Sequence, residues 1–541
     1  MVLFLTPPFV QLNTPYPATP SLVGFLSERG FDCTQRDLSI EVALEVMRTY
    51  GDDFTEEAIE ILQNRHLPDE AKVEMTAYVD EFALWLRDNV DPDFGFSRYA
   101  ERLGVAVPDF GCVLQRLRRR NPIDRMLTAK VEEILAEIRP SVVGVSCPFP
   151  GALLGALRIA QTVRRLAPDV PIVLGGGYVN TELRALDDPR LGRFFDVVMY
   201  DEGYAPWLEY LRATPMRRPE TMRTGPLKIW AGEAVKRLGP EADIPAFVKP
   251  SYRGLDLSLY MDLPESENPM HRLWSTGRWL KIQMARGCYW HKCAFCDVSL
   301  DYIKCFQMPD AATIVDAMEA LVEETGCAPD FHFTDEAMPP ALIERMCREI
   351  IRRKFVCRWW GNVRFDTTFT PKLVKLMAKA GCIAVTGGLE CAVDRLLALL
   401  NKGITLASAR SALTAFRDAG ILVHAYLMYG FPTETEREAV EALGHVRRFF
   451  KEGLIQSAFF HRFALTVHSP IAQNPEKFGI TVDPVQLRKG RTFALNEIPF
   501  HEPDAPDWDR IGKALKLALY NYMRGTGYSK SLKFWFDAVK E

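Results

Sequence analysis

The sequence has no large excess of charge of either sign. Across 541 residues, 66 Lys and Arg side chains face 70 Asp and Glu, which gives a formal net charge of −4 and a pI near 6.2. A protein that holds nucleic acid or an anionic membrane by its charge needs a basic surplus, so we expect neither as a partner. A small molecule or a peptide is the expected substrate.

Long hydrophobic runs and dense cysteine are also lacking. No apolar run reaches the roughly 20 residues that a membrane-spanning helix needs. The apolar N-terminal segment MVLFLTPPFV has no positive residues before it and contains prolines, so we expect a first buried strand rather than a signal peptide. Twelve cysteines scattered over this length differ from the short, cysteine-dense framework of secreted proteins, and the cytoplasm is the expected location.

Alternating apolar strands and helices predict an α/β fold in the N-terminal part, residues 1–235. A strand at VLFLTPPF, a helix and a strand near 32–38 come first, and a charged helical insertion covers about 40–138. The strands SVVGVS, PIVLGGG and FDVVMYDEG follow, with helices between them. Apolar strands separated by helices form parallel sheets, so we expect a doubly wound, Rossmann-like domain with a helical insertion.

The alternation starts again after a linker expected at 236–280. Six strand candidates with helices between them span 281–470: KIQMARG, DFHFTDE, VCRWWGNVRF, CIAVTGGLE, ILVHAYLMYGFP and SAFFHRFALTV. Six β-α units predict an incomplete (β/α)6 barrel of the TIM type. The remaining residues, 471–541, contain an amphipathic stretch near 508–524, for which we expect a helical cap.

Three cysteines stand in the segment ARGCYWHKCAFC, directly after the first strand of the second α/β region. Cys288, Cys293 and Cys296 are spaced C-x4-C-x2-C, so one loop can bring three soft thiolate ligands to one centre. Structural zinc needs a fourth ligand, whereas a four-iron, four-sulfur cluster held by three cysteines leaves one iron open. The spacing therefore favours the cluster, and a structural zinc site is the alternative.

The cysteine loop, its place at a strand end and the six β-α units resemble the radical S-adenosylmethionine superfamily. The resemblance covers about 281–470, although the first cysteine gap is one residue longer than the common C-x3-C-x2-C. The residues Tyr-Trp-His-Lys in that gap resemble the subgroup that carries an N-terminal cobalamin-binding domain. The family implies that the amino and carboxylate groups of S-adenosylmethionine chelate the open iron. A reductant such as flavodoxin or ferredoxin then supplies the electron that releases a 5′-deoxyadenosyl radical.

The resemblance also implies contacts to S-adenosylmethionine from the ends of successive strands. Phe295 matches the aromatic residue near the adenine, Arg364 the partner of the methionyl carboxylate, and Glu390 the acceptor of the ribose hydroxyls. A role in a structural ion pair is the alternative for Arg364 and Glu390. The other matched positions are Thr334, Asp335 and Glu336 for the methionyl amino group, Gly387 and Gly388 for close backbone approach, and Gly430, Phe431 and Pro432 for the adenine-contacting turn.

The N-terminal domain ends successive strands with small residues, as a doubly wound sheet needs if a large ligand lies over its carboxyl edge. The loop TPPFVQLNTPYPATP contains no histidine, although many cobalamin domains carry a cobalt-ligating D-x-H-x-x-G there. We therefore expect cobalamin without a histidine lower ligand, with a cofactor-free fold as the alternative and Cys147 as a small buried side chain. The residues expected around the corrinoid are Ser146, Pro148, Gly175, Gly176, Gly177, Glu202 and Gly203.

Two such cofactors predict methyl transfer to carbon or phosphorus of a small molecule or peptide. Tyr426, His424 and His461 are candidate acid–base groups, with structural packing as the simpler role of such histidines. One alternative is a radical rearrangement, cyclisation or oxidation without methylation. Another is an iron–sulfur or corrinoid-binding regulator without turnover.

Overall fold

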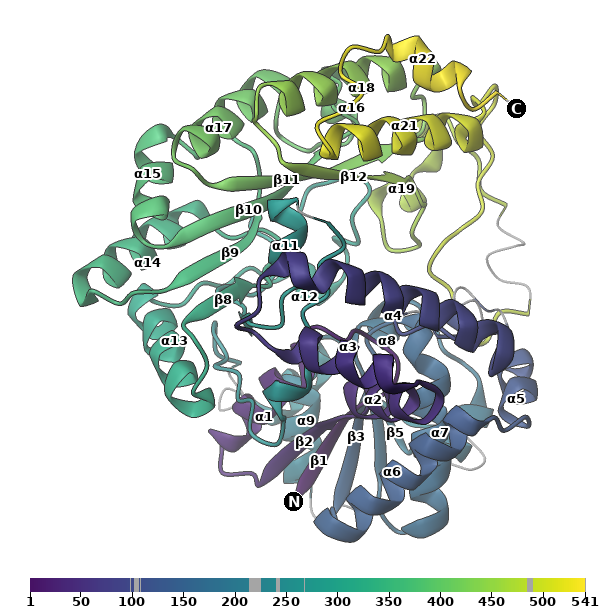
Figure 1. The fold of residues 1–541 in the computed structure, drawn as a ribbon. Coiled ribbons are helices and arrows are strands. Elements are labelled where there is room, and N and C mark those ends of the chain that lie inside the picture. Colours follow the sequence, from purple (N-terminus) through teal and green to yellow (C-terminus); the bar gives the residue numbers. More distant parts are fainter. Residues whose placement is uncertain are drawn as a thin grey trace. The chain divides into compact units, whose positions relative to one another are not determined.

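The fold is that of two compact units, each built around a six-stranded parallel sheet (Figure 1). A computed structural model describes residues 1–97, 99–101, 107, 109–213, 225–239, 244–266, 268–483 and 490–540. Unit 1 comprises Met1–Glu265, Ser275–Arg278 and Leu487–Asn496, and unit 2 comprises Ser266–Trp274, Trp279–Gln486 and Glu497–Glu541. The expected α/β fold class is confirmed.

The sheet of unit 1 has the strand order β2-β1-β3-β4-β5-β6, and all neighbouring strands are parallel. The order reverses at β1, which pairs with β2 on one side and β3 on the other. Such a reversal leaves a crevice outside the carboxyl ends of the strands, where doubly wound proteins bind ligands. The strands are β1 (Val2–Thr6), β2 (Cys33–Asp37), β3 (Val142–Ser146), β4 (Ile172–Gly175), β5 (Val197–Met199) and β6 (Leu227–Ile229).

Helices cover both faces of this sheet because its strands are apolar on both sides. Leu3 and Val145 face a core shared with one set of helices, whereas Phe4 and Val142 face a second core on the opposite side. The helices outside the insertion are α1 (Ala18–Ser27), α7 (Leu153–Leu166), α8 (Gly177–Thr181), α9 (Tyr204–Arg212) and α10 (Ala231–Leu238).

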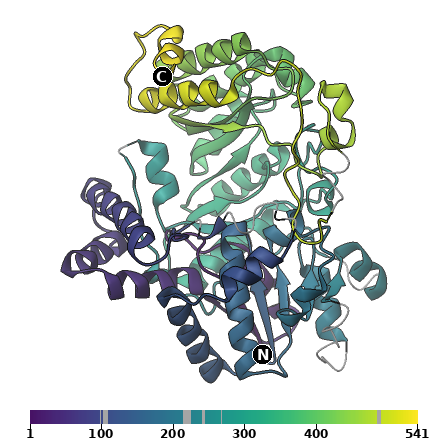
Figure 2. The same cartoon turned by 90° about the vertical axis from the view of Figure 1, so that its right-hand side faces the viewer.

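The helical insertion lies between β2 and β3, and Figure 2 shows its first helices in purple at one side of unit 1. The Lys72 ammonium of α4 in this insertion pairs with the carboxylate of Asp262, which lies far outside the insertion in the chain, at 2.5 Å, and both side chains are buried. None of the helices in the described ranges is both long and apolar enough to cross a membrane. The helices of the insertion are α2 (Leu38–Tyr50), α3 (Asp53–Gln63), α4 (Asp69–Asn89), α5 (Gly111–Leu117) and α6 (Pro122–Ile138).

The sheet of unit 2 follows chain order from β7 to β12, and every neighbouring pair is parallel. This is the arrangement of an open (β/α)6 barrel. Phe333, Val385 and Val423 point to one face and are fully buried. The strands are β7 (Leu280–Ile282), β8 (Asp330–Phe333), β9 (Arg358–Val363), β10 (Cys382–Glu390), β11 (Leu422–Tyr429) and β12 (Ser457–Arg462).

The other face of this sheet carries polar and aromatic side chains, among them Trp360, Thr386 and His424. Figure 1 shows most of the connecting helices on one side of this sheet. We call the face that carries Trp360, Thr386 and His424 the inner face. The helices of unit 2 are α11 (Pro269–Ser275), α12 (Asp301–Lys304), α13 (Ala311–Thr325), α14 (Pro340–Arg353), α15 (Pro371–Lys379), α16 (Asp394–Leu399), α17 (Leu406–Asp418), α18 (Glu436–Lys451), α19 (Pro470–Gln473), α21 (Trp508–Met523) and α22 (Leu532–Asp537).

The C-terminal helices pack on the last strands of unit 2. The Trp508 ring of α21 lies 6.4 Å from the Tyr429 ring at the end of β11. The Trp535 indole of α22 donates to the Tyr522 hydroxyl at 2.9 Å. Helix α21 coincides with the amphipathic stretch at 508–524.

Candidate active site

The three cysteines of the C-x4-C-x2-C segment lie in the loop that follows β7. Cys293 is buried, and Cys288 and Cys296 are half-buried. The Cys293 and Cys296 thiols lie within hydrogen-bonding distance of each other, and this contact lowers the pKa of Cys293 and raises the pKa of Cys296. A lowered thiol pKa favours the thiolate, which is the form that binds metal.

The donor set of this loop is chemically suited to an iron–sulfur cluster. Within the described ranges, no group of three or more His, Cys, Asp or Glu side chains is arranged to hold one metal ion. A four-iron cluster is a larger body than a single ion, so its three thiolates need not converge as closely. Three soft sulfur donors in one loop suit such a cluster.

Asp335 secures the start of the cysteine loop. Its buried carboxylate accepts hydrogen bonds from the backbone N–H groups of Met284 at 2.9 Å and Ala285 at 2.8 Å. Burial raises the pKa of Asp335 to about 7. The Asp335 side chain is thus engaged in holding the backbone, and its carbonyl accepts from the Asn362 amide at 2.8 Å.

The neighbours of Asp335 at the end of β8 face different surroundings. The Thr334 N–H donates to the Ile282 carbonyl at 2.9 Å and so joins β7 to β8. The Glu336 side chain is exposed, yet burial by the surrounding protein raises the pKa of its carboxyl. The Glu336 side chain is therefore open to solvent although many protein atoms surround it.

Arg364 follows β9 and packs against the cysteine loop. Its guanidinium carbon lies 4.0 Å from the Trp290 ring centroid and 5.7 Å from that of Tyr289. Nη2 donates to the Lys402 carbonyl at 2.6 Å. The buried Nε has no hydrogen-bond acceptor among the described residues, with the Asp366 carboxylate 3.6 Å away. A guanidinium held in this way can offer a donor to an anionic ligand group.

Glu390 ends β10 and forms an ion pair, the alternative role that the sequence left open, with Lys402, a partner that the sequence did not identify. The Lys402 ammonium lies 2.7 Å from Oε1 of Glu390, and the two side chains are 12% and 10% exposed. A side chain at Gly388 would overlap the Glu390 carboxylate, so glycine there makes room for the pair. Phe295 lies beside this pair, with its ring centroid 5.7 Å from the Lys402 ammonium.

The turn after β11 begins at a glycine in the left-handed region, and its aromatic residue is part of the core. Gly430 has a φ of +75°, which favours glycine. Phe431 is fully buried against the Phe463 ring, at 5.2 Å between centroids. Its N–H donates to the Glu434 carboxylate at 3.1 Å, and burial raises the pKa of Glu434 to about 8. Pro432 is buried in the same turn, so the buried side chains of Phe431 and Pro432 would leave the backbone as the part of this turn that a ligand could contact.

The candidate acid–base residues lie on β11 and β12. His424 is buried, and its Nδ1 is 2.7 Å from the Ser457 hydroxyl. Burial lowers the pKa of His424 to about 3, so the ring is neutral at pH 7. Its centroid lies 4.9 Å from that of Tyr426, and His461 contacts the exposed Phe459 ring at 4.4 Å. His424 therefore packs as a neutral core histidine.

The residues predicted to surround cobalamin gather at the carboxyl edge of the sheet in unit 1. Gly176 has a φ of +110°, and a side chain there would overlap the Cys147 carbonyl. A side chain at Gly177 would meet the Pro148 carbonyl at 2.8 Å. The Ser146 hydroxyl is buried and has no hydrogen-bond partner in the described part of the chain, which suits a polar ligand group at this edge. Gly203 also has a positive φ, and Glu202 before it is half-buried.

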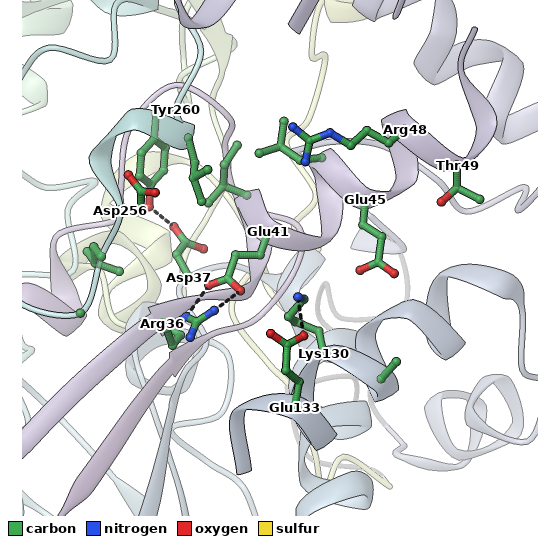
Figure 3. Close-up of a pocket in the computed structure, with 16 residues that line it drawn as sticks. Arg36, Asp37, Glu41, Glu45, Arg48, Thr49, Lys130, Glu133, Asp256 and Tyr260 are labelled. Carbon is green, nitrogen blue, oxygen red and sulfur yellow. Dashed lines mark hydrogen bonds and ion pairs between the residues drawn. The ribbon is translucent and has the colours of Figure 1, made fainter. Parts of the chain in front are cut away.

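A groove of about 990 Å³ in unit 1 lies apart from these residues (Figure 3). It is lined by the end of β2, by α2 and α6, and by residues 254–256 and 259–260. Its charges are largely paired with one another: Arg36 with Glu41 at 2.8 Å and Lys130 with Glu133 at 2.7 Å. This groove contains none of the predicted site residues.

Residues 282–446 match the family model described as the Radical SAM superfamily. The chain is 24% identical to the anaerobic magnesium-protoporphyrin IX monomethyl ester cyclase of Rubrivivax gelatinosus, over 76% of this chain and 70% of that protein. It is 23% identical to the cytidylyl-2-hydroxyethylphosphonate methyltransferase of Streptomyces wedmorensis, over 67% and 71% of the two chains.

Solved structures share the whole fold. The radical S-adenosylmethionine methyltransferase TsrM from Kitasatospora setae, with tryptophan substrate and an S-adenosylmethionine analogue bound, superposes with a TM-score of 0.59 at 18% identity. The match covers 96% of this chain and 88% of TsrM. A second TsrM structure, with cobalamin and a [4Fe-4S] cluster bound, gives a TM-score of 0.55 at 17% identity. Residues 282–446, which begin in β7 and include the cysteine loop, are thus the part of the chain that matches the radical SAM superfamily.

Proposed function

We propose that this protein is a cobalamin-dependent radical S-adenosylmethionine methyltransferase that acts on carbon or phosphorus of a small molecule or peptide. The observation that carries the proposal is the cysteine loop at the carboxyl edge of the sheet in unit 2, combined with the glycine-rich carboxyl edge of the sheet in unit 1. The likeness to TsrM over nearly the whole chain supports the presence of both sites in one protein.

The chain's own residues would divide the work of holding the cluster and S-adenosylmethionine. Cys288, Cys293 and Cys296 would hold the cluster, which when bound supplies the electron for S-adenosylmethionine cleavage. Arg364 offers a buried guanidinium to the methionyl carboxylate, since its Nε has no acceptor in the described chain. Glu390 keeps one carboxylate oxygen beyond its bond to Lys402, and that oxygen is available to a ribose hydroxyl.

Cobalamin would lie over the carboxyl edge of the sheet in unit 1 and carry the methyl group. The buried Ser146 hydroxyl would hydrogen-bond its nucleotide tail, because such a group is costly to leave without a partner. Gly176 and Gly177 let the chain after β4 pack against the backbone of Cys147 and Pro148, whereas Gly175 would leave backbone open to close approach. The β1–α1 loop offers no histidine to cobalt, so the lower face would remain without that ligand.

A second candidate function is a radical cyclisation or oxidation without methyl transfer. The likeness to a protein named as a cyclase favours it, and the same cluster and S-adenosylmethionine site would serve both reactions. The reductant, expected to be a flavodoxin or ferredoxin, and the cytoplasmic location stay predictions.

The test is anaerobic reconstitution with iron, sulfide and hydroxocobalamin, followed by metal analysis and visible spectra. The triple variant Cys288→Ala, Cys293→Ala, Cys296→Ala should lose about four irons relative to the unsubstituted protein and keep the corrinoid. A matched control replaces Cys112, Cys305 and Cys327, three cysteines outside the core, and should keep both. Zinc without iron and sulfide would contradict the proposal, and iron without corrinoid would favour the second candidate.

A further inference from the structure

The turn at residues 400–403, between α16 and α17, is bonded to the cysteine loop at three points. The Ala294 N–H donates to the Leu400 carbonyl at 2.9 Å. The Trp290 indole N–H donates to the Asn401 carbonyl at 2.9 Å, and the Asn401 amide donates to the Lys292 carbonyl at 2.9 Å. The backbone around Cys293 is therefore held by this turn as well as by its own strand.

The shape of this turn leaves little freedom in where its side chains lie. Asn401 and Gly403 have φ values of +51° and +70°. A side chain at Gly403 would overlap the Trp290 ring, so the turn and the loop are in direct contact there. Lys402 lies between these two residues, so its backbone is held at a defined place beside the cysteine loop.

The Lys402 ammonium is a buried charge beside the predicted cluster ligands. It lies 2.7 Å from the Glu390 carboxylate and 5.7 Å from the ring centroid of Phe295, the residue between the last two cysteines. Both charged side chains are nearly inaccessible to solvent. Charges in such surroundings are screened far less than charges on the surface.

We propose that Lys402 and Glu390 are positioning residues whose opposite charges set the reduction potential of the cluster held by Cys288, Cys293 and Cys296. This inference rests on the proposed function, because it needs the cluster. Reduction adds one electron to the cluster and makes it more negative. A nearby cation stabilises the reduced form and a nearby anion destabilises it, so the balance of the pair moves the potential.

The two charges predict shifts of opposite sign. Glu390→Gln leaves the lysine cation uncompensated, so the ratio of reduced to oxidised cluster at a fixed potential should rise about tenfold, which is about 59 mV for one electron. Lys402→Met in the Glu390→Gln background removes that cation and should reverse the shift. This pair of variants isolates the lysine charge, because neither leaves a buried carboxylate that could take up a proton.

The experiment is a mediated redox titration of the reconstituted protein without S-adenosylmethionine, followed by visible and electron paramagnetic resonance spectra. Lys402→Arg keeps the charge and should keep the potential of the unsubstituted protein. Lys379→Met, at the exposed end of α15, is the control for loss of a lysine and should have no effect. A purely structural role would lower the iron content of the variants without moving their potentials in opposite directions.

The outcomes separate this inference from the proposed function. If the unsubstituted protein binds no cluster, the proposed function itself fails. If Glu390→Gln and the double variant both bind about four irons and have equal potentials, the cluster stands and the inference is overturned. If the double variant loses its iron, the test is the comparison of Glu390→Gln with the unsubstituted protein. A rise of about tenfold in the ratio of reduced to oxidised cluster supports the inference, and no rise overturns it.

Discussion

The contact between Gly403 and the Trp290 ring can be tested by adding one methyl group. In Gly403→Ala, the new Cβ would overlap the indole ring, and the backbone has a φ of +70°. A non-glycine residue in the left-handed region costs about 1–2 kcal/mol. Overpacking against a held side chain costs about 1–3 kcal/mol more. The substitution should therefore lower the free energy of unfolding by about 2–5 kcal/mol.

Gly420 provides a control that separates these two costs. It has a φ of +74° in the same unit, and nothing lies within 4 Å of where its Cβ would be. Gly420→Ala should therefore show only the backbone cost of about 1–2 kcal/mol. Urea unfolding of both variants, followed by tryptophan fluorescence, measures the difference. Equal losses of unfolding free energy in the two variants would refute the claim that the turn at Gly403 is packed directly against the Trp290 ring of the cysteine loop.

Three further predictions concern the strand ends and the inner face. Asp335→Ala should speed hydrogen exchange at the backbone amides of Met284 and Ala285, because each buried donor left without a partner costs about 1–3 kcal/mol. The control variant Glu336→Gln should leave the exchange rates of those amides unchanged. Since burial lowers the pKa of His424 from 6.5 to about 3, its contribution to stability should be lost as the pH falls from about 6.5 towards 3. His424→Phe should weaken the loss of unfolding free energy between pH 7 and pH 5, and parallel pH curves would argue against it. Arg364→Lys should reduce the affinity for S-adenosylmethionine, measured by calorimetry, about tenfold, because a lysine lacks the planar fork of the guanidinium. Arg358 is half-exposed and pairs with the buried Asp330, so the control variant Arg358→Lys should leave that affinity unchanged.

Much of the fold follows from local pattern in the sequence. Apolar strands such as SVVGVS and CIAVTGGLE alternate with helices, and buried parallel strands read as near-continuous apolar runs. The cysteine loop is likewise local, because its three ligands lie within nine residues of chain. The α/β class and the radical SAM domain could therefore be predicted. Strand β6 was not among the expected strands, because it lies at the edge of the sheet with Leu227 exposed and Lys228 only half-buried, so no buried apolar run marks it.

The tertiary contacts of the site lie beyond such patterns. Lys402 follows a helix and meets Glu390 twelve residues earlier through a folded turn, so neither spacing nor periodicity marks the pair. The role of Asp335 depends on β8 lying beside β7, which brings its carboxylate to the backbone of Met284 and Ala285. The resemblance matched Asp335 to the methionyl amino group, partly through backbone carbonyls, and that stays a prediction; the two backbone partners of its side chain could not be read from the sequence. Buried polar groups must find partners, but the fold decides which.

The most direct test of the central claim follows the methyl group itself. The reconstituted protein is reduced with cobalamin bound and given S-adenosylmethionine with a deuterated methyl group, and the corrinoid is then released and weighed by mass spectrometry. A methyltransferase of the proposed kind predicts methylcobalamin that carries three deuterium atoms. Unmethylated corrinoid, from protein that still cleaves S-adenosylmethionine to 5′-deoxyadenosine, would contradict the claim and leave a radical enzyme that does not transfer methyl groups.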